Sequence, residues 1–332
     1  MRKHTFTAKT SIIGLGYYVP PKVLTNRDLE KMVDTSDEWI TSRTGIKERR
    51  IAGDDVASSD LGKEAALRAL QNAGIKPKDI DLIIVATISP DMIFPATACI
   101  LQEKIGAKNA TAFDLNAACS GFPYALTVAA QFIETGFYKN ALVIAAEALT
   151  HLVDWQDRST CVLFGDGAGA AVVAPSNDDS GLLASYLGSD GGYVGLLKLP
   201  AGGSALPATH KTIDERLHFL KMAGNEVFKV AVRTMEKAAR EVIKIAGLSV
   251  SDVDCLIPHQ ANMRIIKAVC DRLGIPSEKV FINVDRYGNM SGSSTIVALC
   301  EAIEQGVVKK GSVVVIAAFG AGFTWGANVI KW

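Results

Sequence analysis

The chain has 332 residues, of which 48% are hydrophobic, and its 35 basic side chains balance 35 acidic ones. This length supplies a large core and predicts two subdomains, and the zero net charge gives no reason to expect nucleic acid or an anionic membrane as a partner. The six cysteines show no CxxC pair and no His-rich spacing, so no metal site is predicted. Reduced thiols, and a charged N-terminal segment (residues 1–7) that no apolar run follows, predict a cytoplasmic protein without a secretory signal.

In the first half of the chain, the apolar run at 80–85 predicts a strand. A second short apolar strand leads into residues 114–122, and good helix formers over 121–133 predict a helix that ends near Gly136. A third apolar run, 141–146, predicts a further strand. Buried strands that alternate with helices indicate helices packed on both faces of a sheet.

Cys119 stands at the junction where the second of these strands turns into the helix. A helix N-terminus carries roughly half a positive charge and favours a thiolate over a thiol. A free Cys is also commonly a small buried apolar side chain, so this segment alone leaves both interpretations open. The later segments PHQAN (258–262) and GNMSG (288–292) favour the nucleophile, because a Cys with a His and an Asn elsewhere is typical of acyl-thioester chemistry.

The second half of the chain repeats the pattern of the first. An apolar run at 253–258, a Met-Ser-Gly turn, a helix that ends near Gly306 and an apolar run at 312–318 follow in the same order, 170–173 residues after their counterparts. Each half then has a Gly-rich turn that opens a strand, at 164–169 and 319–323. We therefore predict a five-layered α/β/α/β/α body with two pseudo-symmetric halves, residues 1–178 and 179–332.

Two uncharged stretches, 115–133 and 311–330, are about as long as a membrane-spanning helix. The first contains Asn116 and Pro123, and the second contains several glycines and Asn328. Both are interpreted as strand, turn, helix or hairpin pieces of a buried core, and no membrane partner is expected.

The pseudo-symmetry brings the two central helix starts together and places Cys119 near His259 and Asn289. A thiolate can hold one acyl unit as a thioester while decarboxylation of a malonyl thioester supplies a carbanion equivalent. Two neutral donors, His259 Nε2–H and the Asn289 amide, would stabilise the enolate oxygen, a contribution of about 3 kcal/mol per donor. Asn cannot act as a base, so the pair favours decarboxylation over proton abstraction.

Six motifs follow one another along the chain: SDEWI (36–40), RTGI (43–46), NAACSGF (116–122), FGDGAG (164–169), PHQAN (258–262) and YGN (287–289). With these motifs in this order, the sequence resembles the β-ketoacyl-[acyl-carrier-protein] synthase III family of thiolase-fold condensing enzymes, nearly from end to end. The resemblance implies an acyltransferase that joins an acyl-coenzyme A primer to malonyl-acyl carrier protein and starts fatty acid synthesis. It implies Cys119, His259 and Asn289 as the catalytic residues, a homodimer, and no cofactor beyond the coenzyme A thioester substrate.

The resemblance also assigns binding residues. Backbone N–H groups of Cys119 and Ala321 would form the oxyanion hole, where Ala requires a negative φ or mild strain. Phe94 would reach across the dimer to limit the partner's acyl pocket. Stacking and charge pairing suit the coenzyme A contacts, for which ordinary surface capping is the competing interpretation: Thr35, Trp39, Arg43, Arg158 and Asn262.

Carrier-protein docking is assigned by the resemblance to Gln260, Ala261 and Arg264. Arg264 and Lys267, and more loosely Lys229 and Arg272, would form a basic patch for an acidic carrier protein, with a solvated helix face as the alternative. The family's expected Lys pair near Asp271-Arg272 is reduced here to one cation.

Other functions fit the sequence less well. Thiolases place a second Cys in the last Gly-rich loop, which here has none, and elongating synthases use a second His where this chain has Asn289. A non-catalytic subunit predicts loss of the Cys or the His. A dinucleotide-binding enzyme requires GxGxxG, which residues 14–19 do not complete. A condensing enzyme or acyltransferase of secondary metabolism with the same three residues stays open as the alternative function, and so does the choice of primer.

Overall fold

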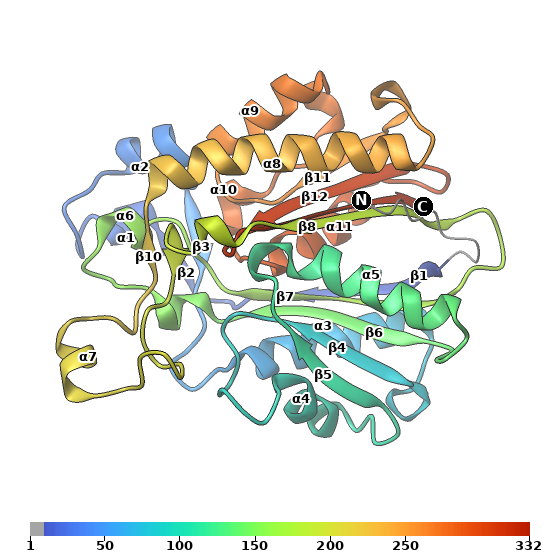
Figure 1. Cartoon of the computed structure of the whole chain (residues 1–332), viewed down its shortest axis with the longest axis horizontal. Helices are drawn as coiled ribbons and strands as arrows, with labels where there is room; N and C mark the ends of the chain where they lie inside the picture. Colours follow the sequence, from blue (N-terminus) through green and yellow to red (C-terminus); the bar gives the residue numbers. More distant parts are fainter. Residues whose placement is uncertain (1–9) are drawn as a thin grey trace.

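A computed structural model of the chain describes residues 10–332 and shows five layers of helix and sheet (Figure 1). Residues 1–7, on which the expectation of no secretory signal depends, lie outside the described residues. In Figure 1 the layers run from α8 and α9, through a first sheet, the pair α5 and α11, and a second sheet, to α3 and α4. The predicted fold class is therefore confirmed.

The sheet built from the first half of the chain has five strands in the order β1-β7-β6-β4-β5. β4 runs parallel to both of its neighbours, whereas β7 pairs antiparallel with β6 and β1. β5 is an edge strand of this sheet, with no strand on its outer side within the described chain. The strands are β1 (Thr10–Tyr18), β4 (Leu82–Ala86), β5 (Thr111–Leu115), β6 (Ala141–Glu147) and β7 (Gly167–Pro175).

The sheet built from the second half has four strands in the order β11-β12-β13-β8. β11 is parallel to β12, and the hairpin β12–β13 continues antiparallel to β8. The position that corresponds to β5 is reduced to one parallel bridge between Leu256 and Val280. The strands are β8 (Gly181–Ser189), β11 (Cys255–Pro258), β12 (Val313–Gly320) and β13 (Thr324–Lys331).

Six helices form the three helical layers. The central pair touches strands of both sheets and is mostly apolar, whereas the outer helices bury one face only. This difference follows from the sequence, because a helix that is apolar on most sides needs cover on most sides. The helices are α3 (Ser58–Ala73), α4 (Thr97–Ile105), α5 (Gly121–Glu134), α8 (Gly224–Ile245), α9 (Met263–Leu273) and α11 (Ser293–Glu304).

Short elements gather beside the ends of the central helices, at the left of Figure 1. The helices and strands of this region are β2 (Val23–Thr25), α1 (Asn26–Leu29), α2 (Asp37–Thr44), β3 (Glu48–Arg50), α6 (Arg158–Cys161), β9 (Leu197–Lys198), α7 (His210–Asp214), β10 (Lys221–Met222) and α10 (Val284–Tyr287). The single-turn 3₁₀ helices, which occur across the molecule, are η1 (Pro77–Asp79), η2 (Ala118–Ser120), η3 (Leu149–Leu152), η4 (Gly191–Tyr193), η5 (Val250–Asp252) and η6 (Ser277–Lys279).

The repeated pattern seen in the sequence is present in the structure. β4, α5, β6 and β7 have counterparts in β11, α11, β12 and β13. The strands predicted from residues 80 and 253 begin two residues later, because Ile80 and Val253 end the 3₁₀ turns η1 and η5. The turn between the halves lies between Pro175 and Gly181, and the division of the chain at 178/179 stays a prediction.

Neither uncharged stretch of the sequence is a single helix. Residues 115–133 contain the end of β5, the turn η2 and α5, and residues 311–330 form the hairpin β12–β13. Within residues 10–332, no helix combines the length and the apolar character that crossing a membrane requires.

Candidate active site

Cys119 lies in η2, between the edge strand β5 and the central helix α5, with 7% of its surface exposed. The last residue of β12, Gly320, packs directly against it: a Cβ added to Gly320 would stand 2.6 Å from the Cys119 backbone nitrogen. A contact this close admits only glycine. The neighbouring Ala118 has a positive φ of 48°, a conformation that costs about 1–3 kcal/mol and is typical of functional sites.

Burial raises the pKa of the Cys119 thiol to about 12. The nearby hydroxyl of Ser291 lowers this pKa, and the carboxylate of Glu147 raises it further. The start of α5 is close to the sulfur, as the sequence predicts, and its partial positive charge acts in favour of the thiolate, against the effect of burial. That the helix start favours a thiolate stays a prediction. Burial favours the thiol, whose proton needs an acceptor when the sulfur attacks.

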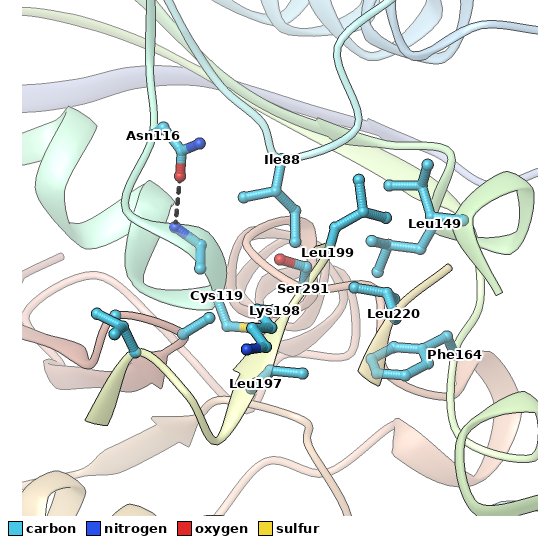
Figure 2. A pocket seen from close by; sticks show the side chains of 15 residues that line it. Ile88, Asn116, Cys119, Leu149, Phe164, Leu197, Lys198, Leu199, Leu220 and Ser291 are labelled. Atoms are coloured by element: carbon cyan, nitrogen blue, oxygen red, sulfur yellow. Dashed lines mark hydrogen bonds between the residues drawn. The ribbon is translucent and has the colours of Figure 1, made fainter. Parts of the chain in front are cut away.

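A mostly apolar cavity of about 330 Å³ opens at Cys119 (Figure 2). Ala321 lies on its wall, as expected for an oxyanion hole, and its φ is not positive, so the Ala at this position is not strained. Figure 2 shows that aliphatic and aromatic side chains from several loops converge on this space. The apolar side chains among its lining residues are Ile88, Leu149, Leu152, Phe164, Val194, Leu197, Leu199 and Leu220.

A second, larger cavity of about 600 Å³ also reaches Cys119. His259 and Asn289 line it, and so do Trp39, Arg43, Asn262 and Arg264 near its outer end. The structure thus brings the three predicted catalytic residues to one cavity, with Cys119 shared between this channel and the apolar pocket.

His259 follows the last residue of β11 and is 1% exposed. Its backbone N–H donates to Ala317 at 2.7 Å, and its Nδ1 lies 2.8 Å from the Ser294 hydroxyl at the start of α11. Burial lowers the pKa of His259 to about 3, so the ring is neutral at pH 7. The Ser294 hydroxyl has one proton and two acceptors within reach, His259 Nδ1 and the Ser291 carbonyl at 2.7 Å. The His259 tautomer that carries its proton on Nε2, the donor that enolate stabilisation requires, is the one in which this hydroxyl donates to Nδ1.

Asn289 lies in the loop between α10 and α11, and the carbonyl oxygen of its side chain is hydrogen-bonded. Its Oδ1 accepts the Ser291 N–H at 2.8 Å, and its backbone N–H donates to Leu163 at 2.8 Å. Because the carbonyl oxygen is engaged, the amide N–H groups are the part of the side chain left for the channel.

The coenzyme A residues expected at the channel mouth form a cluster around one aromatic ring. The Arg43 and Arg158 guanidinium groups lie 5.2 Å and 5.0 Å from the centre of the Trp39 ring. Arg158 also donates to the Asp34 carbonyl at 2.7 Å. Two guanidinium groups therefore lie against the Trp39 ring. Thr35 lies nearby in sequence, and its buried hydroxyl has no partner.

Gln260 is the residue whose expected role the structure corrects. Its side chain is fully buried, and its polar atoms bond to Pro258, Phe281, Asn283 and Val284. It therefore has no free group for a carrier protein and instead braces the loop behind His259.

Ala261 is buried as well, whereas Arg264 is exposed, lies 5.3 Å from the Phe228 ring centre and lines the channel. Asn262 caps α9 by accepting the Ile265 N–H at 2.9 Å. Of the three residues assigned to docking, only Arg264 is exposed, and Lys267, Lys229 and Arg272 of the predicted basic patch are exposed as well.

Phe94 does not line the apolar pocket of its own chain. Its side chain is 81% exposed, and the adjacent Ile93 is 79% exposed. Both lie in the loop between β4 and α4, on the side of the sheet that ends at β5.

Sequence reasoning missed Glu147, Ser291 and Ser294. Glu147 ends the apolar strand β6 and is fully buried. A single acidic residue at the end of an apolar run is a feature of the sequence that could have indicated a functional role. The two serines lie beside Asn289 in sequence, but Ser is too common in turns for this to have marked them. Within residues 10–332, no group of three or more His, Cys, Asp or Glu side chains is placed to hold a metal ion.

Comparison with known proteins decides the family. The models of 3-oxoacyl-[acyl-carrier-protein] synthase III match residues 113–191, and those of its C-terminal part match residues 243–332. A β-ketoacyl-[acyl-carrier-protein] synthase III from Caldanaerobacter subterraneus is 57% identical over 97% of each chain. The chain belongs to this family. It is a condensing acyltransferase with the thiolase-like fold.

Solved structures agree with this assignment. The 3-oxoacyl-[acyl-carrier-protein] synthase III from Aquifex aeolicus is 50% identical, with a TM-score of 0.90 over 97% of this chain and 100% of that one. A priming β-ketosynthase from the R1128 polyketide biosynthetic pathway is 36% identical, with a TM-score of 0.90 over 100% of this chain and 98% of that one.

Proposed function

We propose that the protein transfers a short acyl group from coenzyme A to Cys119 and condenses it with malonyl-acyl carrier protein, with loss of carbon dioxide. The observation that carries the proposal is the position of Cys119 between two cavities. An acyl chain held on the sulfur can occupy the apolar pocket while the malonyl thioester enters through the channel that His259 and Asn289 line.

The first half-reaction forms the acyl-enzyme. The Cys119 sulfur attacks the thioester carbonyl, whose oxygen is stabilised by the backbone N–H groups of Cys119 and Ala321, and coenzyme A leaves as its thiol. Trp39, Arg43 and Arg158 contact the nucleotide end of coenzyme A, with Thr35 and Asn262 nearby, because an aromatic face and guanidinium groups suit a base and its phosphates.

The second half-reaction uses the neutral pair. Loss of carbon dioxide from the malonyl group leaves an enolate, and N–H groups of His259 and Asn289 stabilise its oxygen. The buried site strengthens these hydrogen bonds because water does not compete for them. The enolate carbon then attacks the acyl group on Cys119 and releases a 3-oxoacyl thioester of the carrier protein.

We also infer a cytoplasmic homodimer. Ile93 and Phe94 are exposed in the loop before α4, and the first backbone N–H groups of α4 donate to Asp114 of the edge strand β5. An unpaired strand edge beside exposed apolar groups favours pairing with a second copy. Phe94 then limits the partner's acyl pocket. The six free cysteines support a reducing compartment.

A second candidate function is priming of a secondary metabolite pathway, which the likeness to the R1128 priming ketosynthase supports. The two functions share the chemistry at Cys119 and differ in the acyl group transferred. Rates with a panel of acetyl-, straight-chain and branched acyl-coenzyme A primers, with malonyl-acyl carrier protein as acceptor, separate them.

The central test is acylation of the nucleophile. After incubation with acetyl-coenzyme A, intact-protein mass spectrometry is expected to show one added acetyl group on the wild type and none on Cys119→Ala or Cys119→Ser. Cys161→Ala is the matched control, because Cys161 is also a buried free thiol but lines neither cavity. An unchanged adduct on Cys119→Ala would refute the proposal.

A further inference from the structure

Glu147 is a fully buried carboxyl group at the end of β6. Its Oε2 accepts the Ser89 hydroxyl at 2.6 Å and backbone N–H groups of Ile88 and Ser89 at 3.1 and 3.2 Å, and the Thr87 hydroxyl lies at 3.3 Å. No Lys, Arg or His of the described chain forms an ion pair with it. Burial raises the pKa of Glu147 to about 7 despite these donors, so the group exchanges a proton near neutral pH.

Ser291 connects this carboxyl group to the nucleophile. It lines the apolar pocket together with Cys119 and with Ile88, whose backbone N–H donates to Glu147. The adjacent Met290 packs against Gly167, the strand partner of Glu147. In agreement with these contacts, the Ser291 hydroxyl lowers the pKa of both Glu147 and Cys119. Among the described residues, this buried hydroxyl has no hydrogen-bond partner. Ser291 lines the apolar pocket, where Figure 2 shows it with Cys119. An unpartnered buried hydroxyl costs about 1–3 kcal/mol.

The backbone of Ser291 is held in an unfavourable conformation. Its φ is 49°, a value that a non-glycine residue adopts at a cost of about 1–3 kcal/mol. Its N–H donates to Asn289 at 2.8 Å, and its carbonyl accepts the Ser294 hydroxyl at 2.7 Å. These contacts fix the Ser291 backbone while its side chain lines the pocket at Cys119.

Both half-reactions require a proton to move at Cys119. During acylation the thiol loses its proton, and the departing coenzyme A thiolate gains one. During condensation the Cys119 sulfur leaves as a thiolate and gains one. Because burial penalises a thiolate and the neighbouring Glu147 carboxylate penalises it again, one negative charge shared by the pair is favoured over two.

We propose that Ser291 and Glu147 form a proton relay for Cys119. In acylation, the thiol proton passes to the Ser291 oxygen while the Ser291 hydroxyl proton passes to Glu147, and the proton returns by the same route to the coenzyme A thiolate. In condensation, protonated Glu147 donates its proton to the Ser291 oxygen while the Ser291 hydroxyl proton passes to the Cys119 thiolate. No proton is gained or lost in acylation, and one is consumed in condensation as the carboxylate becomes carbon dioxide.

Other ionisable groups around the relay are engaged elsewhere. From η2, the group that faces Glu147 is the Cys119 thiol itself. β7 places Gly167 opposite Glu147, and the adjacent Asp166 carboxyl group bonds to Thr150 and Ala52. β11 contributes His259, whose lowered pKa keeps it neutral and outside this titration. The loop after β4 gives Glu147 hydroxyl and backbone N–H groups, and the carboxyl group of Asp91 in the same loop accepts hydrogen bonds from Ser59.

The test is the pH dependence of Cys119 acylation, measured by quenched-flow mass spectrometry with acetyl-coenzyme A from about pH 5 to 9. Glu147 accepts a proton only when ionised, so the wild-type rate is expected to rise with pH through about 7 and then level off. In Ser291→Ala and Glu147→Gln the rate above pH 7 falls about 100-fold, within the usual range for acid–base assistance, and the inflection disappears. Ser293→Ala, a neighbouring buried hydroxyl outside the pocket, keeps the wild-type profile.

Persistence of the inflection in Ser291→Ala, or its loss in His259→Ala instead, would overturn the relay. Ser291→Ala decides the outcome if Glu147→Gln does not fold. The inference rests on the proposed role of Cys119, so alkylation by iodoacetamide is followed in parallel, since it reports loss of the thiol proton without an acyl donor. A wild type that is alkylated but never acylated refutes the proposed function. An alkylation profile that is unchanged in Ser291→Ala refutes the relay.

Discussion

At the residue scale, burial shifts the pKa values of the two reacting side chains in opposite directions, and in both it favours the neutral form. It raises the pKa of Cys119 to about 12 and lowers that of His259 to about 3, so both groups are neutral at pH 7. A Cys–His ion pair is therefore not the resting state. The His259 ring is kept as a donor for the decarboxylation step, and the thiol proton has to be taken elsewhere.

This division of roles predicts that His259→Ala and Asn289→Ala impair decarboxylation more than acylation. Removal of one donor to a developing oxyanion lowers the rate of that step by about 10²–10³-fold. Release of ¹⁴CO₂ from malonyl-acyl carrier protein per acylated enzyme measures the step directly. Because the pKa of His259 is about 3, its ring stays neutral and decarboxylation is not lost on lowering the pH from 8 to about 5. Equal losses in both half-reactions, with normal decarboxylation per acyl-enzyme, would contradict the assignment.

At the scale of the secondary-structure elements, the residues of the site lie at the ends of helices and strands. Cys119 precedes α5, His259 follows β11, and Gly320 ends β12 where only a residue without a side chain fits against the Cys119 backbone. The channel mouth is built in the same way, from the first turn of α9 with Arg264 and the first turns of α8. A partner that delivers a thioester therefore meets the N-terminal ends of both helices.

Arg264→Glu is accordingly expected to raise the KM for malonyl-acyl carrier protein about fivefold, equivalent to the largest contribution of an exposed ion pair, with little change in acylation by acetyl-coenzyme A. The effect is expected to shrink at high salt, because exposed charges are screened. Lys244→Glu is the matched control, since it lies at the opposite end of α8, about 30 Å from the first turn. An equal rise in KM for Lys244→Glu would exclude a local docking site.

At the scale of the whole molecule, the sheet built from the first half of the chain ends in the unpaired edge of β5, and the loop before α4 carries exposed apolar side chains. A homodimer with a continuous sheet across a twofold axis would cover this edge. The same association would explain why Phe94 is 81% exposed in a single chain yet is expected at an acyl pocket.

Phe94→Ala is therefore expected to shift the primer preference from about two to five carbons toward longer acyl chains, by about ten- to a hundredfold. The reason is that one methylene group in a hydrophobic pocket changes the free energy of discrimination by about 1–3 kcal/mol. Initial rates with acyl-coenzyme A primers of increasing length measure the shift, and analytical ultracentrifugation of the wild type measures the assembly. Ile93→Ala controls for loss of an exposed apolar side chain. A wild-type chain-length profile in Phe94→Ala, or an active monomer, would contradict the shared pocket.

The sequence by itself determined the layers, the pseudo-symmetry and the identity of the three residues at the channel. Periodicity predicts buried strands and helices, and the segments around Cys119, His259 and Asn289 are distinctive when they are taken together. The resemblance assigned Gln260 to carrier-protein docking, whereas the structure has it buried against Asn283 and Val284. A local motif does not reveal this, because burial depends on residues far away in the chain.

Tertiary structure alone decided the ionisation of the site. The pKa of Cys119 depends on water excluded by β12 and on Glu147, which belongs to a different strand. Ser291 and Glu147 lie 144 positions apart, and neither stands in a pattern that suggests a shared proton. Desolvation and through-space charge have no counterpart in local sequence, and they determine where the proton of the nucleophile can go.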